Sequence, residues 1–298
     1  MVLNPPSQLP PLHTYLIQTD LAWENSKANR LRWDWHLNQI PSNSLVVLPE
    51  MASTGFTMQP QLHAEFADSD TLKFLKDKSD GKCICLSLSF KEDEKYYNRF
   101  FAVSDGEVIA QYDKKHLFSY AKENQHYGSG KETVVFSYLG WKIVPMVCFD
   151  LRFPAWIRKA FLKSSDLTSA PGTSLEYHAD RIEQSMDSAR EFVRDALSTP
   201  EILLVVANWP HARMNAWNAL LKARSIENQC YTIAVNRVGE DGNGIKHTGH
   251  SQVVSFDGEY LLPPFERESL AEVVLEQAPL TAFRERFPFL NEADFDLF

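Results

Sequence analysis

The sequence predicts an α/β layered fold, and two patterns along the chain indicate it. Strand-like and helix-like segments alternate from residue 13 to residue 90, which is typical of α/β layers. Further along, Asp105-Gly106 and Leu139-Gly140 each separate two β-rich runs, as the turns of β-hairpins do. The chain has 298 residues, and the 44% that are hydrophobic supply enough apolar material for a sizeable core.

The N-terminal third alternates between the two kinds of element. Strands are expected over 13–19, 44–50 and 82–90, and helices over 26–40, with Ser26 available as N-cap, and over 71–80. In the first helix, Ala28, Leu31, Trp35 and Leu37 recur at near-helical spacing, which predicts one apolar face.

The rest of the chain is richer in strands. Strands are expected over 96–105, 107–114, 133–148 (a pair), 201–210, 231–239, 251–262 and 270–276, with a helix over 216–229 and a helical tail from residue 281 that Pro288 interrupts. In the helix over 216–229, Leu220, Ala223 and Ile226 lie on one predicted face.

No internal repeat or low-complexity linker divides the chain, so we predict a single domain over residues 1–298. One segment, at about 168–200, stands apart as a helical insertion. Thr173 and Glu176 form a capping box, an apolar stripe from Ile182 to Leu197 follows at helical spacing, and Pro200 ends the helix. Because the insertion lies between two core strands, it could overhang a site, contact another subunit, or be a surface helix without a role.

Composition excludes several classes of protein. The formal net charge is −9 and no basic patch stands out, so no nucleic-acid partner is expected. No apolar run reaches the ~18 residues of a membrane span, and the N-terminus lacks the features of a signal peptide. The spacing of Cys83, Cys85, Cys148 and Cys230 fits neither zinc binding nor a disulfide framework, which favours reduced thiols and a cytoplasmic location. Cys83 and Cys85 are expected on opposite faces of their strand.

Three residues with complementary chemistry end predicted strands: Glu50, Lys114 and Cys148. Strand ends feed the loops that build active sites in α/β folds. A carboxylate can move the thiol proton, an ammonium can stabilise an oxyanion, and a thiolate can attack an electrophilic carbon. Taken singly, a cysteine such as Cys148 at a strand end is more often a small core residue than a nucleophile. The adjacent Lys115 is an alternative to Lys114.

Three segments in order, "LVVLPEMASTGF", "YDKKHLF" and "VPMVCFDLRFP", resemble the signature segments of the nitrilase superfamily of carbon–nitrogen hydrolases. "VANWP" and "ARSIENQCYTIAVNRVG" are similar to the segments that follow in its amidase branch, and the likeness covers about 13–165 and 201–298. The resemblance implies a four-layer α-β-β-α sandwich, a homodimer or higher homo-oligomer, and no metal or organic cofactor. The insertion at about 168–200 departs from the family pattern.

The resemblance also implies roles for individual residues. Glu50, Lys114 and Cys148 match the family's catalytic triad, which selects Lys114 over Lys115. Glu123 matches a second glutamate, although Lys122 and Asn124 depart from the family's flanking residues. The remaining candidates are Phe149, whose backbone N–H would stabilise the oxyanion, and Asn208, Trp209 and Tyr127, which would line the pocket, with His116 as a supporting residue.

Within the family, "MASTGF", "HYGSG" and "CFDLRFPAW" are most similar to the ω-amidase subgroup. That likeness implies a cysteine-dependent amidase acting through a thioester on a small carboxamide such as 2-oxoglutaramate or succinamate. A nitrilase, a carbamoylase or a deaminated-glutathione amidase is the alternative, and a non-enzymatic binding protein or a redox-sensing thiol protein is less favoured. Arg152, Lys115 and Arg213 are candidates to bind a substrate carboxylate, although for Arg152 we favour an ion pair with Asp150.

Overall fold

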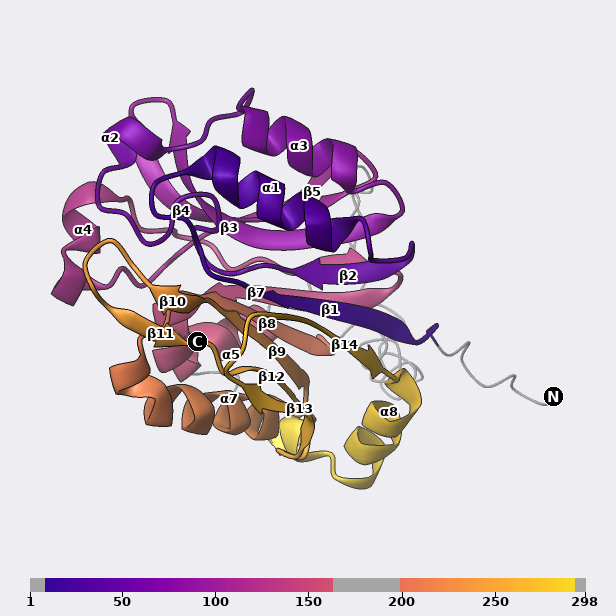
Figure 1. Ribbon diagram of the computed structural model, residues 1–298. Helices are drawn as coiled ribbons and strands as arrows, with labels where there is room; N and C mark the ends of the chain where they lie inside the picture. The colour runs from indigo at the N-terminus through magenta and orange to yellow at the C-terminus, as the bar shows by residue number, and fades with distance from the viewer. Residues whose placement is uncertain (1–8, 163–198, 293–298) are drawn as a thin grey trace, which may run out of the picture.

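The computed structural model describes residues 9–162 and 199–292. Two six-stranded sheets face each other, and helices cover their outer faces, so that the layers are stacked α-β-β-α (Figure 1). The main apolar core lies between the sheets, and a second core lies between the first sheet and its helices. The predicted four-layer α/β sandwich is confirmed.

The first sheet has the strand order β14-β1-β2-β3-β4-β5. Its strands are β1 (Leu12–Gln18), β2 (Ser44–Val47), β3 (Lys82–Glu92), β4 (Lys95–Ser104), β5 (Glu107–Asp113) and β14 (Ser269–Leu275). Strands β1, β2 and β3 are parallel, while β4 and β5 extend the sheet through antiparallel hairpins. The turn at Asp105-Gly106 has positive φ at both residues, 49° and 79°, as a tight type I′ hairpin requires.

The second sheet has the order β13-β12-β9-β8-β7-β6. Its strands are β6 (Phe136–Tyr138), β7 (Trp141–Val147), β8 (Ile202–Ala207), β9 (Tyr231–Asn236), β12 (Ser251–Val254) and β13 (Tyr260–Phe265). The central strands β7, β8 and β9 are parallel, so their carboxyl ends meet at one edge. A separate two-stranded ribbon, β10 (Val238–Glu240) with β11 (Lys246–Thr248), follows β9.

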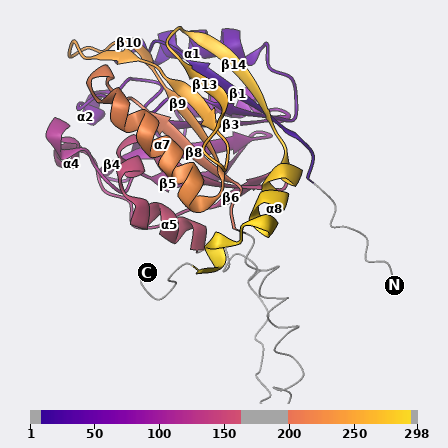
Figure 2. The ribbon, with the colours of Figure 1, turned by 90° about the horizontal axis from the view of Figure 1, so that it is seen from below.

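The helices fall into two layers and a set of connections. Helices α1 (Ser26–Leu37) and α3 (Asp70–Lys78) cover the first sheet, and α5 (Pro154–Leu162) and α7 (Met214–Asn228) lie across the second (Figures 1 and 2). Shorter pieces are α2 (Pro60–His63), α4 (Glu123–His126), η1 (Ser119–Ala121), η2 (Cys148–Arg152), η5 (His211–Arg213) and η6 (Phe289–Glu292), and α8 (Gln277–Arg286) ends before Pro288. None of the helices in the described ranges is long and apolar enough to span a membrane.

The predicted apolar face of the first helix was wrong. Leu31 and Trp35 are exposed, whereas Trp33 and Leu37 are buried. The buried stripe includes the polar Asn29, whose side chain bonds the backbone of the neighbouring loops, and this polar residue hid the true face from the hydrophobic pattern.

In α7, the predicted apolar face with Leu220, Ala223 and Ile226 was also wrong. Trp217 and Leu221 are buried in this helix, while Ile226 is exposed.

Two further expectations concern the cysteines and the insertion. Cys83 and Cys85 lie on the same face of β3, in the core between the sheets, with their sulfurs 3.8 Å apart. The expectation of opposite faces was wrong, because residues two apart in a strand share a face. The helix predicted over about 168–200 lies outside the described residues.

Candidate active site

Three residues that follow strands of the two sheets meet at one point. Glu50 follows β2 and Lys114 follows β5, both in the first sheet, and Cys148 follows β7 in the second. The Lys114 ammonium donates to Glu50 at 2.9 Å, and the Glu50 carboxylate lies close enough to the Cys148 thiol to raise its pKa. The face-to-face sheets therefore bring together the three residues that the sequence singled out.

Lys114 is held between two carboxylates. Its Nζ lies 2.9 Å from Oε1 of Glu50, and 3.0 and 2.9 Å from the two oxygens of Glu123. All three side chains are fully buried. Such a cluster is stable only because the ammonium compensates the carboxylates, since an isolated buried charge is very unfavourable.

Burial and mutual attraction shift the pKa values of this cluster. Burial by itself lowers the pKa of Lys114, but Glu123 and Glu50 outweigh it and raise that pKa above its usual range. The pKa of Glu123 is raised, because burial and the nearby Glu50 outweigh the attraction of Lys114. The lysine is therefore a permanent cation at physiological pH.

The second oxygen of Glu50 faces the other sheet. Its Oε2 accepts the backbone N–H of Asn208 at 2.7 Å, and the Asn208 side chain donates back to the Glu50 carbonyl. Asn208 directly follows β8, next to β7 and Cys148. These two hydrogen bonds fix the Glu50 carboxylate relative to the strand ends of the second sheet.

Cys148 adopts an unusual backbone conformation at the end of β7. Its φ is +48°, in the left-handed region that L-residues avoid, and it opens the short helix η2. Burial is the largest cause that raises the pKa of the thiol, the Glu50 carboxylate raises it further, and Lys114 opposes them. In the free protein the sulfur is therefore a protonated thiol at physiological pH, with the Glu50 carboxylate nearby.

Asp150 ties the Cys148 turn to the segment after Lys114. Its carboxylate accepts the Tyr112 hydroxyl at 2.8 Å and both the backbone N–H and the ring Nδ1 of His116 at 2.8 Å. The His116 ring stacks on Phe153 at 3.6 Å. His116 thus supports the turn, as expected, whereas the favoured Arg152–Asp150 ion pair was wrong because His116 and Tyr112 occupy the Asp150 carboxylate.

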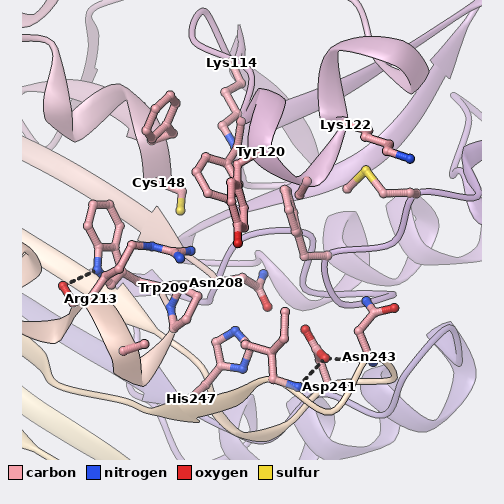
Figure 3. A pocket seen from close by; sticks show the side chains of 18 of the residues that line it. Lys114, Tyr120, Lys122, Cys148, Asn208, Trp209, Arg213, Asp241, Asn243 and His247 are labelled. Carbon is pink, nitrogen blue, oxygen red and sulfur yellow. Dashed lines mark hydrogen bonds between the residues drawn. The ribbon is translucent and has the colours of Figure 1, made fainter.

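A cavity of about 560 Å³ opens next to Cys148 (Figure 3). Its wall combines aromatic side chains with a few polar and charged groups. Of the expected site residues, the wall includes Lys114, Cys148, Phe149, Arg152, Asn208, Trp209 and Arg213. A largely apolar cavity with few polar groups is typical of a small-molecule site.

Two sequence candidates lie elsewhere. Tyr127 is buried behind the site, where its hydroxyl donates to the Thr57 carbonyl at 2.9 Å and bonds Ser89 at 3.0 Å, and it does not line the cavity. Lys115 lies outside the cavity wall, with its ammonium over the Trp156 ring at 5.2 Å. Neither is placed to contact a molecule in this cavity.

With this geometry in place, comparison with known proteins identifies the chain. The carbon-nitrogen hydrolase family model matches residues 8–283. The chain belongs to the carbon-nitrogen hydrolase family. It is therefore a hydrolase acting on carbon–nitrogen bonds, as the three sequence segments predicted.

Full-length relatives of the hydrolase carry amidase names. Omega-amidase YafV of Escherichia coli (strain K12) is 33% identical over 289 residues, which cover 96% of this chain and 98% of the relative. The Yersinia enterocolitica protein of the same name is 36% identical, covering 94% and 95%. The 2-oxoglutaramate amidase of Bacillus subtilis (strain 168) is 25% identical, covering 95% and 97%.

Solved structures agree with the fold. XC1258 from Xanthomonas campestris, described as a CN-hydrolase superfamily protein with an arsenic adduct in the active site, aligns with a TM-score of 0.80 and 31% identity over 96% of this chain and 98% of that chain. Nit3 of Saccharomyces cerevisiae, a nitrilase-superfamily member, aligns with a TM-score of 0.73 at 19% identity over 94% of this chain and 96% of that one, which supports the fold alone.

The most important residue of the hydrolase that sequence reasoning missed is Asn98. It lies in the middle of β4, and its Nδ2 donates to Oε1 of both Glu50, at 2.8 Å, and Glu123, at 3.0 Å. Ser87 in turn donates to Oδ1 of Asn98 at 2.9 Å. A buried amide inside the aromatic run "YYNRFF" was the available signal.

The ribbon β10–β11 of the hydrolase was also missed. Its turn brings Asp241, Asn243, Ile245 and His247 into the wall opposite Lys114 (Figure 3). Burial, then the positive charge of Arg237, lowers the pKa of His247 to about 4, against the opposing effect of Asp241. The imidazole is therefore neutral at physiological pH. In the sequence this ribbon reads only as a loop between two strands.

Proposed function

We propose that this hydrolase is a cysteine-dependent amidase that converts a small carboxamide, such as 2-oxoglutaramate or succinamate, into the acid and ammonia. The observation that supports it most directly is the Cys148 thiol at the cavity wall, near a Glu50 carboxylate that Lys114 holds in place. The amidase names of the full-length relatives support this choice of substrates.

In the first half of the proposed reaction, Glu50 takes the thiol proton as the Cys148 sulfur attacks the amide carbon. The new carbon–sulfur bond forms as the carbonyl π-electrons move to oxygen. The oxyanion is stabilised by the Lys114 ammonium and by the backbone N–H of Phe149, which lies in the first turn of η2. Glu50 then returns the proton to the amide nitrogen, the carbon–nitrogen bond breaks, ammonia leaves, and a thioester remains.

In the second half, water replaces ammonia. Glu50 removes a proton from the water as its oxygen attacks the thioester carbon, and the same two donors stabilise the second oxyanion. The carbon–sulfur bond breaks, the proton passes to sulfur, and the acid leaves. Glu123 contacts Lys114 with both oxygens, and its proposed role is to keep the ammonium in place between the two half-reactions.

A nitrilase, a carbamoylase or a deaminated-glutathione amidase would use the same three residues, so the substrate separates these alternatives. We would incubate the protein with 2-oxoglutaramate, succinamate, an aliphatic nitrile and an N-carbamoyl amino acid, and measure ammonia release. We expect release from the two amides at least tenfold faster than from the others, and none from the Cys148→Ala variant. Full amidase activity in Cys148→Ala would refute the mechanism, and preference for the nitrile or carbamoyl compound would refute the substrate class.

A further inference from the structure

The cavity is positively charged, although the protein is acidic. Three cations besides Lys114 line it: Lys122, Arg152 and Arg213. Within residues 9–162 and 199–292, no carboxylate forms an ion pair with any of the three. The acid that lines the same cavity, Asp241, uses Oδ1 to accept the N–H groups of its own turn. With a formal net charge of −9 for the whole chain, this local excess of cations favours an anionic ligand.

Of these three cations, Arg213 is the least exposed. Its backbone carbonyl accepts the indole N–H of Trp209 at 2.9 Å, which fixes the η5 turn. Its guanidinium lies 4.9 Å from the centre of the Phe118 ring, and in Figure 3 the side chain points into the cavity on the side of Cys148. The backbone N–H of Phe118 bonds Glu123 at 2.6 Å, so the ring beneath Arg213 belongs to the same rigid loop as the buried charge cluster.

The Arg213 guanidinium has no acceptor in the described part of the chain. Its residue is half-buried, and the side chain forms no hydrogen bond or ion pair with the described residues. A partly desolvated guanidinium has five donors in a planar fork that matches a carboxylate. A ligand carboxylate would satisfy donors that the protein leaves open.

The start of helix α7 adds to the positive potential at this place. The helix has 15 residues, begins at Met214 directly after Arg213, and has neither a side-chain cap nor an acidic residue in its first turn. The positive end of its dipole is therefore not neutralised by its own cap or first turn, and it adjoins the part of the cavity lined by Ala212 and Arg213.

We propose that Arg213 binds the substrate carboxylate remote from the amide, and so selects amides with an anionic far end over neutral amides of the same shape. This inference rests on the proposed amidase function, because it places the scissile amide at Cys148. Arg152, which also forms no ion pair with the described residues, is more exposed and lies over the Trp209 ring at 5.2 Å. It is the matched residue against which the assignment to Arg213 is tested.

The test compares succinamate with succinamide, in which a neutral amide replaces the carboxylate. For Arg213→Gln we expect kcat/KM for succinamate to fall by about 10–100-fold, mostly through KM, the size of a lost charge-assisted hydrogen bond. For succinamide we expect less than about a threefold change. In Arg152→Gln the ratio of the two kcat/KM values should change by less than about twofold. Equal losses on both amides in Arg213→Gln, or an anion-selective loss in Arg152→Gln instead, would overturn the proposal.

Calorimetric titration with succinate separates this proposal from the amidase proposal, because it needs no turnover. We expect succinate to bind the wild-type protein and to bind Arg213→Gln at least tenfold more weakly. If the wild type released no ammonia from any amide while succinate binding still required Arg213, the amidase proposal would fail and the anion site would stand. Equal succinate affinity in the two proteins would reject the anion site whatever the activity.

Discussion

Nδ2 of Asn98 donates a hydrogen bond to Oε1 of Glu50 at 2.8 Å, and it also lies 3.0 Å from Oε1 of Glu123. Nζ of Lys114 contacts the same two oxygens at 2.9 and 3.0 Å. One ammonium and one amide therefore hold two buried carboxylates in a closed ring. The ring fixes Oε1 of Glu50, while Oε2 accepts the backbone N–H of Asn208 from the second sheet.

Replacing Asn98 by Ala should lower both activity and stability. Each carboxylate would lose a buried donor, and a lost hydrogen bond to a charged group costs about 1.5–3 kcal/mol. We expect the free energy of unfolding to fall by about that amount and kcat to fall at least tenfold. Denaturant titration and ammonia release measure the two quantities.

Asn124→Ala is the matched control for that prediction. Asn124 is the exposed residue next to Glu123 on α4, and its side chain forms no hydrogen bond with the ring in the described part of the chain. Its replacement should leave stability within ~0.5 kcal/mol, as for surface substitutions in general. An Asn98→Ala protein as active and stable as the control would show that the ring does not need the amide.

Lys114→Met should destabilise the protein by more than the loss of the hydrogen bonds that the ammonium forms. The variant leaves Glu50 and Glu123 buried without a cation, and breaking a buried ion pair in this way costs about 3–5 kcal/mol. Adding Glu123→Gln removes one uncompensated charge, so the double variant should regain about 2 kcal/mol while remaining inactive. A double variant that is no more stable than Lys114→Met would mean that Glu123 is already protonated in the single variant.

Glycine is usually less stabilising than alanine at a buried position. The left-handed backbone of Cys148 predicts the reverse order for the inactive variants Cys148→Gly and Cys148→Ala. At φ +48° alanine retains the steric strain that glycine relieves, by about 1–2 kcal/mol. Cys148→Gly should therefore be at least as stable as Cys148→Ala. At Cys230, which is buried and has no such φ, glycine should be less stable than alanine. Thermal unfolding of the four variants checks this, and the same order at both positions would contradict it.

The sequence predicted most strands because β-rich runs and tight-turn dipeptides are local signals, whereas the pairing of two sheets in a sandwich was implied by the family resemblance. Glu50, Lys114 and Cys148 became candidates because each ends a predicted strand, and the resemblance of the three segments to the family's signatures selected them. Asn98 was not found, because its role depends on which residues of the other strands face it, and that is fixed only when the sheet is assembled.

The misassigned helix faces have a similar cause. In α1 the buried stripe contains Asn29, whose partners are backbone carbonyls of two loops, Ala22 just before the helix and Ser53 after β2. A hydrophobic pattern cannot register a polar residue that is buried because its hydrogen bonds are satisfied. The same limit applies to His247, which reaches the cavity only through the pairing of β10 with β11.

His247 should make the stability of the protein depend on pH in a defined window. Its pKa is lowered to about 4 by burial, against ~6.5 in an unfolded chain, so between these values the unfolded state binds more protons. The contribution of the neutral His247 imidazole to the free energy of unfolding is fully present above pH ~6.5 and is lost as the pH falls toward 4. The full effect of such a shift is about 3 kcal/mol.

Replacing His247 by Gln removes the titrating group and should flatten this part of the profile. We would measure the free energy of unfolding of wild type and variant at pH 7 and pH 4.5 by denaturant titration. The loss between the two pH values should be smaller in His247→Gln by about 2–3 kcal/mol. His211→Gln, at an exposed histidine bonded to Thr248 on the same ribbon, should retain the wild-type loss. If His247→Gln lost as much stability as the wild type, the imidazole would have to be solvated rather than buried among Arg237 and the cavity wall.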